Sequence, residues 1–436
     1  MDEQVLGLAR KVAQEAEVYG LSSQETLVSF EANRLKILQG RETQGMALRL
    51  IKDGRIGFAS ATRSEDPQWL VDTALEMAGF GAAASFHLPA PQPVKGPLIF
   101  DERVATLDVE QMVAMGQGMI EKVRAYDASI LCDAELRLST ATTRLTNSRG
   151  LQARWQKTML SAGIHGNLVR GTDMLDVWEE ASWCSPEGVD PEQLVRNLIE
   201  KIAQAKDAAH VTTGRMPVIF TPKGVMMTIA LPLQLAFNGK IVQQGASPLG
   251  DKLGQEVFDP RFSLYDDGTV DLAPASGPYD HEGVPTQRTP LVENGVVRNF
   301  YFDLQTAGKA GQRSTGNGRR GLESLPAPAV TSWMIAPGQV SYADMVADVK
   351  EGIVVDQTMG AWAGNLLSGE FSGNVHLGYK VENGRIVGRV KDTMVAGNVF
   401  QALKELAAIG CQAEWVEGRA KVPPLYFPSL SVATKA

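Results

Sequence analysis

Three short turn signals, each set between apolar runs, constrain the fold of this chain more than any other feature. They are Asp53-Gly54, Asn294-Gly295 and Asn383-Gly384. Asn-Gly and Asp-Gly pairs favour type I′ turns, in which both central residues need positive φ, and such turns join antiparallel strands. The chain is therefore predicted to form β-hairpins at these three places and to contain much antiparallel sheet.

Several helices are predicted between the strand-like runs, from apolar residues at helical spacing. They are expected over about residues 3–18, 66–79, 108–126, 191–205 and 223–235. Asp108 and Asp190 are predicted N-caps, because a carboxylate there can accept the free N–H groups of the first turn. Pro67 stands in a first turn, where its missing N–H costs nothing. The strand Val218–Pro222 is predicted to lead into the last helix.

The order of these elements predicts an α+β fold in three domains. An N-terminal domain (residues 1–95) and a middle domain (96–210) both place a helix before hairpins, which indicates an internal structural duplication. The Pro-rich stretch 88–93 is interpreted as an extended linker between them. In residues 211–436 strands and glycines dominate, so this C-terminal domain is expected to form a mainly antiparallel curved sheet or barrel-like body.

Composition excludes several classes of function. The net charge is -8 and no dense Lys/Arg cluster occurs, which argues against nucleic-acid binding. No basic and apolar leader is found at the N-terminus and no apolar run approaches the length of a membrane span, so a cytoplasmic protein is expected. Cys132, Cys184 and Cys411 lack Cys-x-x-Cys spacing and are interpreted as buried structural thiols in a reducing compartment.

The common catalytic motifs are missing from the sequence. The five histidines are all more than forty residues apart, so no two can share a helix face as zinc peptidases require. There is no Gly-x-Ser-x-Gly elbow, and Gly316-Asn317-Gly318 is not followed by the Lys-Ser or Lys-Thr of a phosphate loop. We therefore predict no catalytic residue and no metal ligand in this chain.

Four segments of the C-terminal half form a recognisable set. They are Asp280–Gly283, Leu291–Gly295, Ser314–Arg320 and Tyr379–Gly384. The set resembles the TldD/PmbA family, also called the modulator of DNA gyrase family, and the likeness covers nearly the whole chain. In the TldD branch a His-Glu-x-x-x-His helix binds zinc and a Cys near the C-terminus completes the site. Here the corresponding helix segment is Ala230–Leu235 and the nearest thiol is Cys411, so the chain is similar to the PmbA branch, also called TldE.

This resemblance implies a non-catalytic subunit of a zinc metallopeptidase that processes or degrades short or unfolded peptides. The zinc is then expected in a TldD-like partner, in a heterodimer, with no cofactor in this chain. Two alternatives stay open. One is a homo-oligomeric peptide-binding or regulatory protein, for instance a homodimer, because a duplicated fold can form a symmetric pair. The other is a peptidase with an unrecognised site of its own.

The resemblance also marks polar and glycine positions as candidates for peptide or partner binding. They are Asp280, Glu282, Asn317, Arg319, Arg320, Gly369 and Ser372. The first two flank a histidine and can form either a weak metal site or a turn capped by the Asp. The two arginines can clamp a carboxylate of a peptide or partner, or hold a loop through backbone carbonyls. The glycine-rich stretch from Gly369 allows another backbone to approach, as in peptide binding by strand addition.

Overall fold

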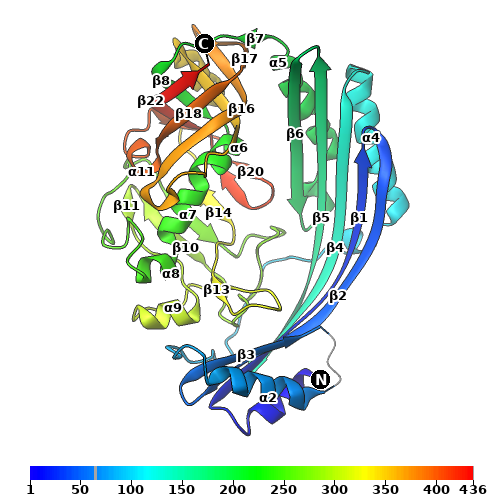
Figure 1. Ribbon diagram of the computed structural model, residues 1–436, viewed down its shortest axis with the longest axis vertical. Coiled ribbons are helices and arrows are strands. Elements are labelled where there is room, and N and C mark those ends of the chain that lie inside the picture. The colour runs from blue at the N-terminus through cyan, green and yellow to red at the C-terminus, as the bar shows by residue number, and fades with distance from the viewer. Residues whose placement is uncertain (63–65, 436) are drawn as a thin grey trace.

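The computed structural model describes residues 1–62 and 66–435, and a curved six-stranded antiparallel sheet forms one side of it (Figure 1). The strands are β1 (Glu15–Glu31), β2 (Arg34–Lys52), β3 (Arg55–Ala61), β4 (Leu131–Asn147), β5 (Gln152–Arg170) and β6 (Asp173–Trp183). Their order is β3-β2-β1-β4-β5-β6. We call this sheet the half-barrel. Since β1 pairs with β4, strands from both sides of the Pro-rich linker share one sheet.

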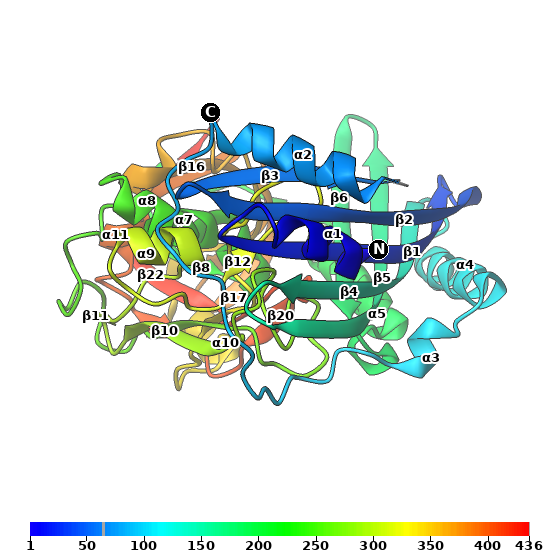
Figure 2. The same cartoon turned by 90° about the horizontal axis from the view of Figure 1, so that it is seen from below.

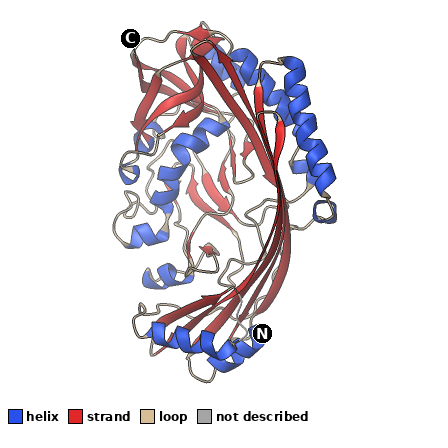
Figure 3. Cartoon of the chain, turned by 45° about the vertical axis from the view of Figure 1, so that its right-hand side comes forward, coloured by secondary structure: helices blue, strands red, loops and turns tan. Residues whose placement is uncertain are grey.

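Helices before and after each set of three strands cover this sheet. They are α1 (Asp2–Ala9), α2 (Pro67–Ala78), α3 (Glu102–Ala105), α4 (Val109–Tyr126) and α5 (Pro191–Gln204). Figure 2 shows α1 and α2 together over one end of this sheet. Figure 3 shows the two longest helices, α4 and α5, along its other end. The order helix, three strands, helix thus occurs twice, as the predicted duplication requires. The division into domains 1–95, 96–210 and 211–436 stays a prediction.

The N-caps explain why three predicted helices begin where they do. Asp66 accepts the amides of the first turn of α2, and Asp190 does the same for α5. Asp108 forms a reciprocal capping box with Gln111 at the start of α4. Each carboxylate satisfies N–H groups that have no partner within the helix. These three helices are confirmed.

The first predicted helix, over residues 3–18, is wrong beyond Ala9. Helix α1 ends there, and Glu15–Val18 opens strand β1, which pairs with β2 along its whole length. The helical spacing of apolar residues continues to Val12, but that side chain is 38% exposed. Pairing with strands on both sides outweighs a weak helical pattern, because tertiary contacts override local propensity.

The C-terminal part contains a closed five-stranded barrel, which confirms the expected curved or barrel-like body. Its strands are β8 (Gly214–Phe220), β15 (Glu351–Met359), β16 (Glu370–Glu382), β18 (Thr393–Asn398) and β22 (Leu425–Thr434). The ring runs β15-β8-β22-β18-β16 and is closed by pairing of β15 with β16. Its apolar cluster includes Val218, Phe220, Val355, Phe371 and Phe427. Closure leaves none of these five strands as a free edge within the ring.

Smaller elements connect the barrel to the half-barrel. A second sheet has the order β11-β10-β9-β14-β21-β20. The strands not yet named are β7 (Ala208–Ala209), β9 (Leu264–Asp267), β10 (Arg288–Glu293), β11 (Val296–Val297), β12 (Gly318–Arg319), β13 (Ala327–Pro328), β14 (Trp333–Ile335), β17 (Arg385–Val390), β19 (Ala408–Ile409), β20 (Glu414–Val416) and β21 (Ala420–Val422). The remaining helices are α6 (Pro222–Val225), α7 (Leu231–Phe237), α8 (Gly239–Gln243), α9 (Leu304–Lys309), α10 (Tyr342–Asp348) and α11 (Val399–Ala402).

The three predicted hairpin turns are all present. Asp53-Gly54 joins β2 to β3, Asn294-Gly295 joins β10 to β11, and Asn383-Gly384 joins β16 to β17. All six residues have positive φ, as type I′ turns require. Within residues 1–62 and 66–435, no helix is both long and apolar enough to span a bilayer.

Candidate functional site

The segment predicted to correspond to a zinc helix follows strand β8. Thr221 caps α6 through the amide of Gly224, and the helix continues through a π-helical turn, Met226–Ala230, into α7. Pro232 stands in the first turn of α7. A proline inside a helix lacks the N–H and clashes with a preceding carbonyl, and a wider π turn relieves that clash. The π turn Met226–Ala230 directly before α7 fits this effect of Pro232.

The residues of this helix do not fit a zinc ion. Zinc in proteins is held by imidazole, thiolate and carboxylate groups, whereas Ala230–Leu235 carries only one polar side chain, that of Gln234. Ala230 and Leu233 are buried in the apolar core. In the two described ranges, no group of three or more His, Cys, Asp or Glu side chains is placed to hold a metal ion.

Asp280, the first predicted binding residue, builds a buried turn. Its carboxylate accepts the amides of Glu282 and Val284 at 2.9 Å each, and that of Gly318 at 2.9 Å. The turn interpretation of this motif is thus the one the geometry shows. Because the third amide belongs to the Ser314–Arg320 segment, the same carboxylate holds the two predicted motifs together.

Glu282 and Arg320 belong to a buried ion network that joins the half-barrel to these C-terminal loops. Arg49 on β2 lies 2.6 Å from Glu282 and 2.8 Å from Glu17 on β1, and Arg320 lies 2.8 Å from the same Glu17 oxygen. Burial raises the pKa of Glu282, and the positive charge of Arg49 opposes that rise. One oxygen of Glu282 accepts a hydrogen bond from the Arg49 guanidinium, and the other accepts one from the amide of Leu304. Both contacts suit the ionised carboxylate, which accepts hydrogen bonds through both oxygens.

The other predicted residues fall into two places. Asn317 donates to Asp266 at 2.6 Å, and Arg319 donates to the carbonyl of Ala275 at 2.5 Å, both beside the turn of Asp280. Gly369, with φ 78°, ends a short 3₁₀ turn, and exposed Ser372 follows on β16. The fold thus brings five of the seven residues together, and each of the five has at least one internal hydrogen bond or ion pair, although Nε and Nη2 of Arg320 are buried without a partner. Their role in peptide or partner binding stays a prediction.

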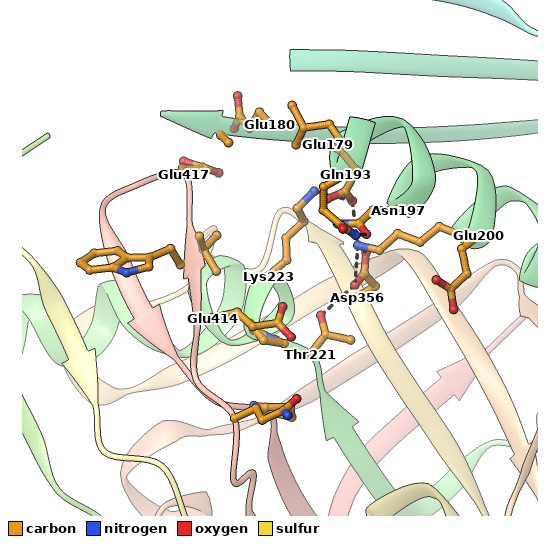
Figure 4. A pocket seen from close by; sticks show the side chains of 18 of the residues that line it. Glu179, Glu180, Gln193, Asn197, Glu200, Thr221, Lys223, Asp356, Glu414 and Glu417 are labelled. Atoms are coloured by element: carbon orange, nitrogen blue, oxygen red, sulfur yellow. Dashed lines mark hydrogen bonds and ion pairs between the residues drawn. The ribbon is translucent and has the colours of Figure 1, made fainter. Parts of the chain in front are cut away.

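A cavity of about 530 Å³ lies where the half-barrel meets the C-terminal part, and sequence reasoning missed it (Figure 4). Helix α5 and strand β6 line one side, and α6, β15 and β20 line the other. Its acidic residues are Glu179, Glu180, Glu187, Asp190, Glu200, Asp356, Glu414 and Glu417, and its basic residues are Lys201 and Lys223. No short motif connects these positions, because the first and last of them, Glu179 and Glu417, are more than 200 residues apart.

Both lysines of the cavity are held by carboxylates. Lys201 Nζ lies 2.8 Å from Glu179 and 2.8 Å from Asp356, and Lys223 Nζ lies 3.1 Å from the same Glu179 oxygen. Thr221 donates to Asp356 at 2.8 Å. Burial alone would lower the pKa of Lys201, but the two carboxylates outweigh burial and raise it. These charges balance one another across the boundary between half-barrel and barrel.

The remaining carboxylates make the cavity negative. In Figure 4, Glu180 on β6 and Glu417 in the β20–β21 turn approach each other from opposite walls. Burial, together with the charge of Glu417, raises the pKa of Glu180 to about 7. Burial also raises the pKa of Glu414. A cavity of this charge suits cationic groups such as the amines and guanidinium groups of peptides. Cys411 lies in its lining and is exposed, contrary to the prediction, whereas Cys132 and Cys184 are buried.

Comparisons with known proteins agree with this architecture. An uncharacterized protein from Methanocaldococcus jannaschii is 28% identical over 404 residues, 92% of this chain and 93% of its own. A metalloprotease PmbA homolog from Haemophilus influenzae is 27% identical over 227 residues, 52% of this chain and 47% of its own. The aligned part thus spans about half of that metalloprotease.

Two solved structures show the same fold over 99% of each chain. TldE from Thermococcus kodakarensis superposes with a TM-score of 0.90 at 23% identity. A putative modulator of a DNA gyrase from Thermotoga maritima superposes with a TM-score of 0.89 at 24% identity. Residues 213–434 match the PmbA/TldA metallopeptidase C-terminal domain, and residues 16–78 match domain 1 of the same family. The chain belongs to the PmbA/TldD metallopeptidase family.

Proposed function

We propose that this chain is a non-catalytic, TldE-like subunit of a zinc metallopeptidase. The observation that carries the proposal is the helix after β8, where Ala230–Leu235 offers no imidazole, thiolate or carboxylate. A zinc peptidase needs at least three such ligands and an open position for water. The zinc and the general base therefore come from a TldD-like partner, and this chain carries no cofactor of its own.

In this proposal the chain contributes binding surface. The acidic cavity between half-barrel and barrel supports a role in holding cationic groups of a short or unfolded peptide. In the Gly369–Gly373 stretch only Glu370 and Ser372 are exposed, so contact with an extended peptide there runs through these two side chains. The heterodimer works in the cytoplasm, where the three free cysteines stay reduced.

Zinc content and peptidase activity of the purified chain test the proposal, measured alone and after mixing with a TldD-like subunit of the same organism. We expect less than about a tenth of an equivalent of zinc alone and about one per heterodimer, with chelator-sensitive cleavage only in the mixture. A Cys411→Ser variant is the matched control, because it removes the exposed thiol that can bind zinc adventitiously.

Stoichiometric zinc and chelator-sensitive cleavage in the pure chain, unchanged in the Cys411→Ser variant, overturn the proposal and indicate an active site of its own. A pure chain that binds peptides as a homodimer, and gains no activity from any zinc-bearing subunit, also overturns it. That second result favours the homo-oligomeric peptide-binding protein.

A further inference from the structure

The inference concerns the outer edge of the half-barrel along the first half of β2 (Figure 1). Strand β3 pairs with β2 only from Met46 to Lys52. In the part of the chain that the structure describes, no strand pairs with residues 34–42 on the side away from β1. We call residues 34–42 the β2 edge. A strand edge of this kind carries free backbone donors and acceptors, which can pair with another extended chain.

Alternate residues of the β2 edge direct their backbone groups to the free side. The carbonyl of Ile51 accepts the amide of Gln14, which leads into β1, so the odd-numbered residues of β2 face β1. Successive residues of an antiparallel strand point their N–H and C=O groups to opposite sides, and the register with β1 shows no shift between Ile51 and Leu38. The backbone groups of Leu38, Gly40 and Glu42 therefore face outwards.

The backbone of the β2 edge is open to an approaching chain. Every residue from 34 to 42 is exposed. Apart from the chain neighbours of Gly40, no described heavy atom lies within 4 Å of the position that a Cβ would take there. A glycine at the middle of an edge lets another backbone come close. The three outward-facing residues offer about six backbone hydrogen bonds, two for each residue, and such bonds hold peptides in strand addition.

Aliphatic side chains lie exposed on both faces of the β2 edge. Ile37 is 38% exposed, Leu38 55% and Leu35 47%. Neighbouring side chains of a strand point to opposite faces, so Ile37 and Leu38 present apolar surface on either side of the backbone. An added strand covers this surface when it carries aliphatic residues on both of its own faces.

The charge of the β2 edge is opposite to that of the whole chain. Arg34, Lys36 and Arg41 flank the aliphatic pair, and Glu42 is the one carboxylate, whereas the chain has a net charge of -8. Lys36 lies 3.5 Å from Glu31 across the hairpin, but within the described residues Arg34 and Arg41 have no ion pair. These cations attract acidic side chains and repel a second copy of the same edge.

We propose that the β2 edge binds an extended peptide segment, with a short aliphatic centre and acidic flanks, by strand addition. The outward backbone groups of Leu38, Gly40 and Glu42 pair with that segment, and Arg34 and Arg41 hold its carboxylates. The inference rests on the proposed function for the class of ligand, short or unfolded peptides. It adds a second site whose preference is opposite to that of the acidic cavity, which suits cationic groups.

Fluorescence anisotropy with the full-length chain, without a zinc-bearing subunit, tests the proposal. The probe is a fluorescein-labelled heptapeptide of three valines between two glutamates on either side. One control peptide has lysine in place of every glutamate. The other is N-methylated at the three valines, so that neither of its edges can complete a ladder of hydrogen bonds. We expect both control peptides to bind at least about tenfold more weakly than the probe.

Two variants of the chain place the binding at this edge. Gly40→Pro removes an outward N–H without breaking a bond to β1, and we expect it to weaken probe binding at least about tenfold. Arg34→Glu/Arg41→Glu changes two exposed side chains and should reverse the preference, so that the lysine peptide binds better. Lys309→Glu/Lys404→Glu makes the same change of charge at exposed residues of the C-terminal part. This matched control keeps the preference of the wild type.

Several results overturn the proposal. They are a probe that does not bind up to about 1 mM, an N-methylated peptide that binds as well as the probe, and a charge-reversed variant that still prefers glutamate. A folded Gly40→Pro variant, checked by circular dichroism, that keeps full affinity has the same consequence. So does a dimer in analytical ultracentrifugation that Gly40→Pro dissociates, because a second copy then occupies the edge. None of these measurements involves zinc or cleavage, so failure of this site and failure of the proposed function are distinguishable.

Discussion

Replacing Arg49 by methionine tests whether the motif around Glu282 is internal structure or a binding surface. Arg49 is buried and contacts Glu282 at 2.6 Å and Glu17 at 2.8 Å. Methionine has a similar length and no charge, so Arg49→Met removes the cation with little change in volume. Glu17 keeps Arg320 as its partner at 2.8 Å, whereas Glu282 loses its counter-ion.

The cost follows from one buried carboxylate left unpaired. Removing a single partner from a buried ion pair typically costs about 3–5 kcal/mol of stability, and we expect Arg49→Met to fall in this range. Glu282→Gln leaves Arg49 with Glu17 and should cost about 1–3 kcal/mol. The double variant should cost less than the sum of the two, with a coupling of about 1–3 kcal/mol, because the two groups lie in direct contact.

Equilibrium urea unfolding of the full chain, followed by far-UV circular dichroism and tryptophan fluorescence, measures these differences. Arg34→Met is the matched control, since Arg34 lies on the same strand and is exposed, and its expected effect is within about 0.5 kcal/mol. The reasoning is refuted if Arg49→Met costs no more than this control. It is also refuted if the two single effects simply add, because the network would then carry no pairwise coupling.

Three further predictions concern the cavity and its walls. Gly418→Ala should cost about 2 kcal/mol or more in urea unfolding, because Gly418 has φ 67° and an added Cβ would lie 2.1 Å from the carbonyl oxygen of Ser182. Lys201→Met should cost at least about 2 kcal/mol in the same assay, because it removes the cation between two carboxylates. Stability of the wild type should fall as pH rises from about 4.5 towards 7, because folded Glu180 retains its proton longer than the unfolded chain does. In Glu417→Gln, unfolding measured at pH 5 and pH 8 should show a smaller fall.

Local sequence signals predicted the elements whose cause is itself local. The Asn-Gly and Asp-Gly turns need two positive φ values that few other residue pairs supply, so their positions follow from residue type alone. The helices over about 66–79, 108–126 and 191–205 carry their own N-caps and were placed within one or two residues. The closed barrel was expected only as a curved or barrel-like body, because ring closure depends on which distant strands pair.

The first helix shows where local signals fail. Residues 3–18 contain apolar residues at helical spacing, yet Glu15–Val18 lies between β2 and β4. No residue in that stretch indicates the two strands beside it, which lie more than thirty and more than a hundred residues away. Apolar residues at helical spacing in a short stretch therefore predict a helix only where no distant strand forms hydrogen bonds with the same backbone.

The candidate sites differ in the same way. The Asp280 and Asn317 motifs were found because their residues are neighbours in sequence, but the network that buries them includes Glu17 and Arg49 from the other end of the chain. The histidines are far apart in sequence, which rules out a shared helix face. The sequence did not reveal that His165 and His376 both lie near the carboxylate of Asp176, because this arrangement needs three strands from two parts of the fold.

The position of β6 at the edge of the half-barrel accounts for the cavity. An edge strand presents unpaired backbone groups that invite another strand to add. Here side chains of the C-terminal part occupy that edge, since Arg389 donates to the carbonyl of Met174 and Lys223 to that of Trp178. The acidic residues of β6 hold these cations in place and, as charges on an edge, oppose pairing with a barrel strand.

A sheet and a barrel joined through side chains rather than through a continuous ladder leave space between them. That space is the acidic cavity, and its width depends on ion pairs instead of backbone hydrogen bonds.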